Sequence, residues 1–370
     1  MVKSLVARGM ARFRQLCCLG LESEVVIPAL LAELHTLVPS LANTFYFTDA
    51  KGETSHIYLE NTEFYPLLPI YWELVHERSE LSVKGNSFSE AKGIFGAHTR
   101  QNAVIADRAA IMRTDFYNLT ERVVGYDPNF LRLIVRHGGR MLGGVRMWRA
   151  FGHGEWSDIE MRRLETLGPF FAHALTAHGA GEMPFVDSRE QGLIVASTVG
   201  KVIYFTTEGK RLLFLATHPR NGPGTAFRPL EVLPPPLARL CTNLRHVFAD
   251  ETVSEAPTYS CRNAWGEFSF RAQWLEGTDA AAGLVAITAT QREPRRLRLA
   301  RNVQQLALTA RQADVCVLLA EGLSIDAIAG RLGISRHTVN EHSRWIYNNL
   351  DVHSRAELTG RLLAPAGLDA

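Results

Sequence analysis

The sequence predicts a chain of three domains: two α+β domains with antiparallel sheets, followed by an all-α domain of four helices. Three observations predict this order. The chain has 370 residues, which is enough for two or three domains of ordinary size. Two separate segments, about 5–178 and 191–290, combine hairpin patterns with helical periodicity. The last segment, 306–364, is helical in its periodicity throughout and is divided by glycines and capping residues.

The composition is that of a folded globular chain, with 46% hydrophobic and 21% charged residues. The 40 basic and 38 acidic residues leave a net charge of only +2, so a nucleic-acid partner has to be argued from local features. The five cysteines are dispersed and form no CxxC pair, which argues against a disulfide framework and against a zinc ribbon. We expect no metal and no cofactor. The apolar runs are too short to span a bilayer, so we expect no membrane partner and a location in the cytoplasm.

The first domain is expected over residues 1–182. Helical periodicity over 26–38 precedes two β-rich runs that flank the turn at 49–52, which predicts a hairpin. A second pair of runs flanks 137–140. Ser157 and the acidic residues after it predict the start of a closing helix. Helix, two hairpins and helix together indicate an α+β domain.

The second domain is expected over residues 188–290. Short strands are predicted at 192–196 and 202–205, with a short helix at 208–215. The Pro- and Gly-rich stretch 219–236 reads as a loop, and helical spacing returns at 237–248. Two further β-runs, 268–275 and 283–289, complete a small sheet with helices on one side.

Residues 291–305 are interpreted as a basic linker. Five arginines and one glutamate lie between positions 292 and 301. Two readings are open for them: a solvated linker or helix surface, and a set of phosphate contacts beside a DNA-binding domain.

The final domain, 306–364, divides into four predicted helices. Thr309, Ser324, Ser335 and Ser354 are the expected capping residues. Gly333 separates the second helix from the third with a connection of about three residues. Such a short connection crosses two helices steeply, as in helix-turn-helix modules.

The third of these helices carries the candidate DNA-reading residues. Arginine and asparagine side chains can make paired hydrogen bonds to guanine and adenine edges, and a capped helix N-terminus can lie against a phosphate. Trp345 and Tyr347 have two readings, as cover for the core or a subunit contact, which is favoured, or as contacts to the DNA backbone. The predicted DNA-binding residues are Ser335, Arg336, His337, Thr338, Asn340, Glu341 and Arg344.

The segment 306–363 resembles the LuxR-type helix-turn-helix domain of bacterial transcription regulators. The resemblance implies a homodimer that binds double-stranded promoter DNA at a roughly palindromic site. The matching pieces cover the whole module: Leu308-Thr-Ala-Arg-Gln, Leu319-Ala-Glu-Gly, Ile328-Ala-Gly-Arg-Leu-Gly-Ile-Ser, Thr338-Val, His342, Ile346-Tyr, Leu350 and Val352-His-Ser-Arg-Ala-Glu-Leu.

The segment departs from the usual residues of this family at two positions. Gln312 stands where the family usually has glutamate, and Asn340 where it usually has lysine. Six arginines and six acidic residues leave residues 306–363 without net charge, which lowers the expected phosphate neutralisation. An alternative function follows, in which the helix-turn-helix has lost affinity for DNA and docks a protein partner.

The two upstream domains resemble sensor modules. Residues of about 20–178 resemble a GAF-like domain, on pieces such as Arg113-Thr-Asp-Phe-Tyr-Asn and Trp156-Ser-Asp, and residues of about 188–290 resemble a PAS-like domain, on pieces such as Asn263-Ala-Trp-Gly-Glu-Phe. The resemblance implies an unknown small-molecule effector held by aromatic side chains. Ordinary core packing is the alternative for each candidate. The candidate ligand-binding residues are Tyr46, His56, Tyr58, Trp72, Phe116, Tyr117 and Trp148 in the first domain, and Tyr204 and Trp265 in the second.

Catalytic signatures are missing from the sequence. It contains no phosphate-loop motif, no HExxH and no GxSxG. We therefore expect no catalytic residues and no enzymatic activity. The leading hypothesis is a ligand-responsive transcription regulator.

Overall fold

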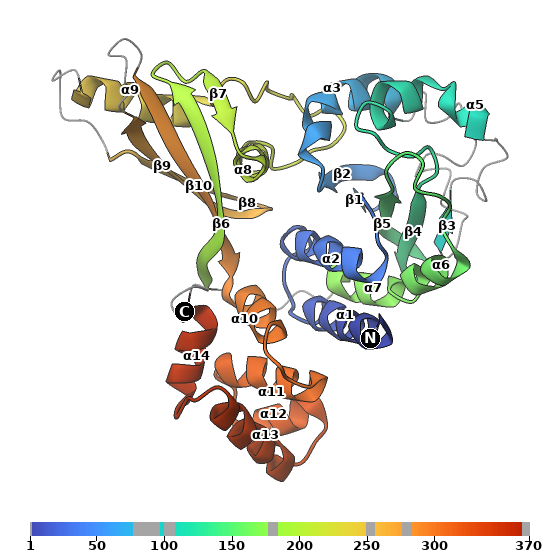
Figure 1. The fold of residues 1–370 in the computed structure, drawn as a ribbon, viewed down its shortest axis with the longest axis vertical. Helices are drawn as coiled ribbons and strands as arrows, with labels where there is room; N and C mark the ends of the chain where they lie inside the picture. Colours follow the sequence, from blue (N-terminus) through green and yellow to red (C-terminus); the bar gives the residue numbers. More distant parts are fainter. Residues whose placement is uncertain are drawn as a thin grey trace.

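The structure is a computed structural model that describes residues 2–76, 97–99, 108–176, 184–248, 256–275 and 283–364. Two α+β units lie side by side above a smaller helical unit, which holds the last part of the chain (Figure 1). Each α+β unit has one five-stranded sheet, and all strand pairs in the described residues are antiparallel. The predicted order of two antiparallel-sheet regions followed by a helical region is confirmed.

The sheet of the first unit has the strand order β2-β1-β5-β4-β3. Both predicted hairpins are present, because β1 pairs with β2 and β4 pairs with β5. Helices α1, α2 and α7 pack together on one face, where the ring of Phe171 contacts those of Phe13 and Phe45. Ser157 caps α6 in a capping box with Glu160, as the sequence predicts. The bounds are α1 Val2–Cys17, α2 Ser23–Leu37, β1 Ala42–Thr48, β2 Thr54–Leu59, β3 Ala97–Thr99, β4 Leu131–His137, β5 Arg140–Trp148, α6 Asp158–Glu165 and α7 Gly168–Thr176.

Short helical turns lie against the opposite face of this sheet. Side chains from them meet Tyr46 and Trp148 of the sheet around one small cavity. The turns are η1 Thr62–Leu67, α3 Leu68–Ile70, η2 Tyr71–Val75, α5 Arg108–Met112 and η5 Tyr117–Glu121.

The sheet of the second unit has the strand order β7-β6-β10-β9-β8. Helix α8 packs closely on β6, because a Cβ atom on Gly192 would lie 2.3 Å from the Cα atom of Gly209. The other face of this sheet is exposed to solvent at Leu193 and Tyr204. The side chain of Tyr204 is 70% exposed. Strand β8 was not predicted, since its alternation contains few apolar residues. The bounds are β6 Phe185–Ser197, β7 Val202–Phe205, α8 Thr207–Thr217, α9 Pro235–Phe248, β8 Thr258–Asn263, β9 Gly266–Leu275 and β10 Leu284–Pro294.

The helical unit has one apolar core that includes Val315, Ile328 and Ile346. Leu299 and Val303 of α10 belong to the same core, so five helices share it rather than the four predicted. Apolar residues at helical spacing among the arginines explain this addition. The bounds are α10 Arg295–Gln304, α11 Ala310–Ala320, α12 Ile325–Leu332, α13 Arg336–Asn349 and α14 Arg355–Leu363.

The segment interpreted as a basic linker, 291–305, consists of the end of β10 and helix α10. Its arginines are engaged within the chain. Arg298 is 4% exposed and pairs with Glu293, which also accepts a hydrogen bond from Arg301 at 2.8 Å. Arg296 pairs with Glu321 of the helical unit at 3.2 Å. These arginines therefore hold α10 in place, and the phosphate-contact reading loses its support.

Contacts between the units are specific. The two α+β units meet where Tyr65 stacks on Phe214, with ring centroids 3.9 Å apart. The indole Nε1 of Trp72 donates to Asn221 Oδ1 at 3.1 Å. Helix α1 contacts both α10 and α11, and the carbonyl oxygen of Leu19 accepts from Arg296. The helical unit is thus attached to both of the others.

Candidate nucleic-acid interface

Helices α12 and α13 are set by local sequence signals. Ser324 caps α12 by accepting from the backbone N–H of Ala327, and Ser335 caps α13 by accepting from Thr338 at 3.0 Å. Between them Gly333 has a left-handed backbone with φ of 62°, which a residue with a side chain adopts at a cost. The tight connection that the glycine allows places α12 against α13.

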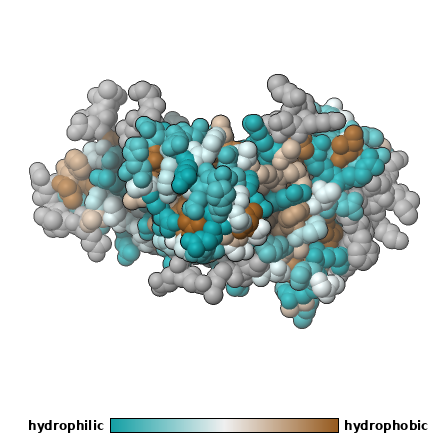
Figure 2. Space-filling model, turned by 90° about the horizontal axis from the view of Figure 1, so that it is seen from below, coloured by the Kyte–Doolittle hydropathy of each residue, from teal (hydrophilic) through white to brown (hydrophobic). Residues whose placement is uncertain are grey.

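One side of α13 faces the core and the other faces solvent. Val339 and Ile346 are fully buried, and the hydroxyl of Ser343 turns back to donate to the Val339 carbonyl oxygen. On the other side the predicted DNA-reading residues are exposed, except Thr338, which is half-buried. The helix lies at the end of the molecule farthest from the two sheets (Figure 1). Seen from that end, the surface is largely hydrophilic (Figure 2).

Contacts with acidic side chains occupy part of this exposed face. Arg336 Nε lies 2.8 Å from Asp326 Oδ1 of α12, and His337 Nε2 lies 3.2 Å from Glu341 Oε1 one turn along the helix. Arg344 has no acidic partner among the residues that the structure describes. The face therefore offers Arg344 and Asn340 directly, and Arg336 in competition with Asp326.

The two aromatic residues of α13 differ in their surroundings. Tyr347 packs against the core of the helical unit, whereas Trp345 is 41% exposed. The core-cover reading fits Tyr347. For Trp345, a subunit contact and a DNA contact both stay open.

Three of the predicted ligand-binding residues line one cavity in the first unit: Tyr46, Phe116 and Trp148. Its volume is about 10 Å³, which is room for about one water molecule. The cavity wall is mostly apolar and aromatic, and within it the Trp148 indole donates to buried Glu121 at 3.0 Å. Tyr117 lies outside this wall and is buried, with its hydroxyl directed at the Tyr126 carbonyl oxygen. Core packing therefore accounts for Tyr117.

A larger cleft of about 640 Å³ lies between the two α+β units and reaches α10. It brings together two predicted residues from different units, because the rings of Tyr58 and Trp265 are 5.8 Å apart. His56 also contacts the Trp265 ring. Two of the remaining candidates lie elsewhere, since Trp72 binds Asn221 and Tyr204 is on the open sheet face.

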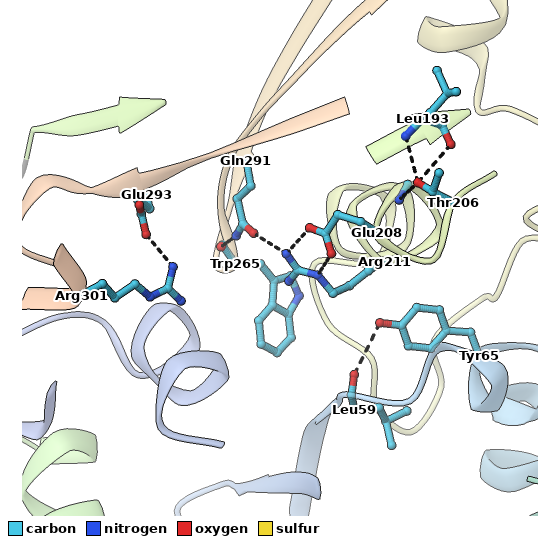
Figure 3. Close-up of polar contacts among 11 residues, drawn as sticks. Leu59, Tyr65, Leu193, Thr206, Glu208, Arg211, Trp265, Gln291, Glu293 and Arg301 are labelled. Atoms are coloured by element: carbon cyan, nitrogen blue, oxygen red, sulfur yellow. Dashed lines mark hydrogen bonds and ion pairs between the residues drawn. The ribbon is translucent and has the colours of Figure 1, made fainter. Parts of the chain in front are cut away.

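The cleft has a polar wall with balanced charges (Figure 3). Arg211 makes two hydrogen bonds to Glu208, at 2.8 and 2.6 Å, and a longer one to Gln291. The side-chain amide of Gln291 donates in turn to the Trp265 carbonyl oxygen at 2.7 Å. Arg301 pairs with Glu293 on the α10 side of the cleft. The arginines that line this wall are thus already matched by carboxylates.

Sequence reasoning missed a second groove, of about 780 Å³, beside the loop 218–236. Arg220 and Arg228 lie at its rim. The stretch was read only as a loop because of its prolines and glycines. The signal that was available is the pair of arginines in a segment without acidic neighbours over 217–230.

Two further observations concern absent features. Among the described residues, no group of three His, Cys, Asp or Glu side chains is arranged to hold a metal ion. No helix in the described ranges has the length and apolarity that a membrane crossing needs.

The comparisons with known proteins bear on the helical unit. The profile of the family described as "Bacterial regulatory proteins, luxR family" matches residues 306–361. These residues form a LuxR-type helix-turn-helix domain. In the LuxR-type domain, Gln312 still accepts from the Thr309 backbone N–H at 2.9 Å, so the departure from glutamate preserves the capping box.

Similar proteins match only part of this chain. A protein of Aeromonas salmonicida named "Putative HTH-type transcriptional regulator in exeN 3'region" is 43% identical over 65 residues, which are 16% of this chain and 33% of that protein. A Mycobacterium tuberculosis (strain ATCC 25618 / H37Rv) protein with the name "Putative HTH-type transcriptional regulator" is 35% identical over 104 residues, 28% of this chain and 12% of that protein. The chain spans a third or less of the length of these relatives.

Two solved structures show weak overall similarity. The crystal structure of the phage VqmA-DPO complex aligns with 46% of this chain and 78% of its own, at 19% identity and a TM-score of 0.17. The crystal structure of the E. coli DhaR(N)-DhaL complex aligns with 79% of this chain and 90% of its own, at 9% identity and a TM-score of 0.25. These scores are too low to establish a shared fold, so the GAF-like and PAS-like assignments stay predictions.

Proposed function

We propose that the protein is a ligand-responsive transcription regulator that binds double-stranded promoter DNA as a homodimer. The observation that carries the proposal is the solvent-facing side of α13, where Arg336, Asn340 and Arg344 are exposed. Side chains of these types read guanine and adenine edges in the major groove. The LuxR-type domain over 306–361 supports the same function. The proposal assigns no catalytic activity to the chain and places it in the cytoplasm with the DNA.

A two-fold arrangement follows from how such modules read DNA. Paired reading helices bind half-sites about one helical turn apart, so the operator symmetry mirrors that of the protein. The upstream units would then set the spacing of the two reading helices. A ligand can shift that spacing only by binding one arrangement better than the other, with a coupling of about 1–3 kcal/mol in ordinary cases.

The test begins with selection of bound fragments from a genomic library by the full-length protein. Affinity for a recovered fragment is then measured for Arg344→Ala and Asn340→Ala. Each is expected to weaken binding about tenfold, since one good base contact contributes about 1–3 kcal/mol. Arg140→Ala is the control, because Arg140 is exposed at the start of β5, outside the LuxR-type domain. Unchanged affinity in both α13 variants would refute the assignment of the reading helix.

A second function has one observation in its favour. The LuxR-type domain has no net charge, and three of its candidate reading residues, Arg336, His337 and Glu341, already contact another polar side chain. This balance suits a helix-turn-helix that docks a protein partner instead of DNA. Failure to recover any DNA fragment, together with native mass spectrometry of a complex with a captured protein, would favour it.

A further inference from the structure

The groove beside the loop 218–236 lies on the helix-covered side of the second sheet. Side chains from α8, α9 and the edge strand β8 line it together with the loop. Its wall includes Leu237, Tyr259 and Phe270, which are apolar or aromatic, and Arg220 and Arg228 are at the rim. None of the residues that line the groove is acidic. The groove thus combines an apolar wall with positive charge.

The two arginines differ from those of the neighbouring cleft. Arg211 and Arg301 are each paired with a carboxylate, whereas Arg220 and Arg228 have no ion pair with any residue that the structure describes. Their guanidinium donors therefore face solvent and are not already occupied by a carboxylate. An anion in the groove could accept hydrogen bonds from them.

The loop that carries these arginines is anchored at several points. The Ile57 backbone N–H donates to the Asn221 carbonyl oxygen at 2.8 Å, across the boundary between the two units. A Cβ atom on Gly222 would lie 2.0 Å from the Ser55 carbonyl oxygen, so the backbones are in close contact. Farther along, Leu233 donates to Gly200 at 2.9 Å. Anchoring of this kind presents the arginines at fixed places, which reduces the entropy cost of binding a ligand.

His218 lies in the same wall and does not add to the charge. Its ring is stacked between Phe214 and Phe227, at 4.5 and 5.5 Å. Burial lowers the pKa of His218 despite its hydrogen bond to the Phe214 carbonyl oxygen, so the ring is neutral at pH 7. The arginines are therefore the cations that an anion meets.

We propose that this groove binds a small organic anion with an apolar body, whose headgroup lies at Arg220 and Arg228 and whose body lies against Tyr259 and Phe270. Carboxylate and phosphate both match the donor geometry of a guanidinium group. A role of this site in regulation rests on the proposed function above, in which the bound anion would be the effector. Binding itself does not depend on that function.

Contacts of the loop connect the groove to the rest of the molecule. The carbonyl oxygen of His218 accepts from the Trp265 indole at 3.1 Å, and the Trp265 ring contacts Tyr58 of the first unit. Asn221 joins the same loop to Trp72. A ligand that prefers one position of the loop would therefore bias the contact between the two α+β units.

The test is isothermal titration calorimetry of the full-length protein with three probes that share one chain: octanoate, octyl phosphate and octanol. The two anions separate a carboxylate headgroup from a phosphate, and the alcohol lacks the charge. We expect at least one anion to bind at least about tenfold more tightly than octanol, as expected for a charge-assisted contact. Equal binding of all three probes, or no binding of either anion, would overturn the proposal.

Variants locate the binding. Arg220→Gln and Arg228→Gln should each weaken binding of the anion about fivefold to tenfold and leave that of octanol unchanged. Both side chains are exposed, so the substitutions should not affect folding, and the lysine variants Arg220→Lys and Arg228→Lys should recover part of the affinity. Arg271→Gln is the matched control, since Arg271 is exposed on β9 outside the groove. Wild-type affinity in both glutamine variants would place the anion elsewhere.

A second readout uses the thiol of Cys261, which lines the groove and is half-buried. In a Cys18→Ser background, which removes the exposed thiol, the bound anion should slow modification of Cys261 by a thiol reagent at least threefold. An unchanged rate at saturating anion would contradict the placement. Neither measurement involves DNA, so loss of anion binding and loss of promoter binding are separate results.

Discussion

Arg336 and Asp326 form an ion pair that joins the first turn of α13 to the first turn of α12, with 2.8 Å between Nε and Oδ1. Both side chains are more than 60% exposed, so the pair itself contributes little to stability. Its effect is on the exposed face of α13. A guanidinium group held by a carboxylate is a weaker donor to DNA than one that is free.

Replacing Asp326 should therefore strengthen DNA binding. Asp326→Asn removes a negative charge from the proposed interface and releases Arg336, and we expect affinity for a promoter fragment to rise about threefold to tenfold. Fluorescence anisotropy with a labelled fragment measures it. Asp158→Asn is the matched control, because Asp158 also lies in the first turn of a capped helix, α6 of the first unit. A fall in affinity would mean that Asp326 itself contacts the DNA.

The salt dependence of DNA binding should be shallow. Arg331, Arg344 and Arg355 have no acidic partner among the described residues of the LuxR-type domain. With each phosphate contact adding about −0.9 to the slope of log K against log salt, three contacts per subunit predict a slope of about −5 for a dimer. Titration from 50 to 300 mM KCl tests this value. A slope near zero would favour the partner-docking alternative.

Glu293 should be essential for the attachment of α10. Its carboxylate binds both Arg298 and Arg301, and Arg298 is almost completely buried. Glu293→Gln leaves that buried guanidinium without its counter-charge, which should lower the free energy of unfolding by about 3 kcal/mol. Urea unfolding measures the change. Glu267→Gln breaks the more exposed pair with Arg292 and should cost less than about 1 kcal/mol, so equal losses would contradict the argument.

The contribution of His35 to the stability of the first unit should fall as the pH rises above neutrality. The hydrogen bond from His35 Nε2 to Glu60, at 2.9 Å, raises the pKa of His35 above its usual value of 6.5. A raised pKa in the folded state stabilises the protein below pH 6.5 and loses that effect as the pH rises through the folded value. Unfolding at pH 6 and pH 8 should therefore show a smaller difference between wild type and His35→Gln at pH 8. An equal difference at both pH values would exclude this linkage.

Local sequence signals predicted much of the fold. Ser324 and Ser335 cap the helices they were expected to cap, and Gly333 ends α12 with a left-handed backbone. These features depend on residues three or four apart in the sequence. The spacing of the apolar residues Val339 and Ile346 predicted which side of α13 faces solvent.

Features that depend on distant residues could not be predicted. The sequence allowed a solvated surface or phosphate contacts for the arginines of 292–301. Their actual partners could not be predicted, because Glu321, which pairs with Arg296, and the Leu19 carbonyl oxygen belong to other elements. The cleft joins Tyr58 to Trp265 although they are far apart in the chain. The groove at Arg220 and Arg228 was missed for the same reason, since its apolar wall comes from β8, β9 and α9.

Strand β10 ends at Pro294 and α10 begins at the next residue, Arg295. No flexible linker lies between the second sheet and α10, the helix that leads into the LuxR-type domain. A twist or tilt of that sheet would therefore move α10 with it and change the orientation of α13.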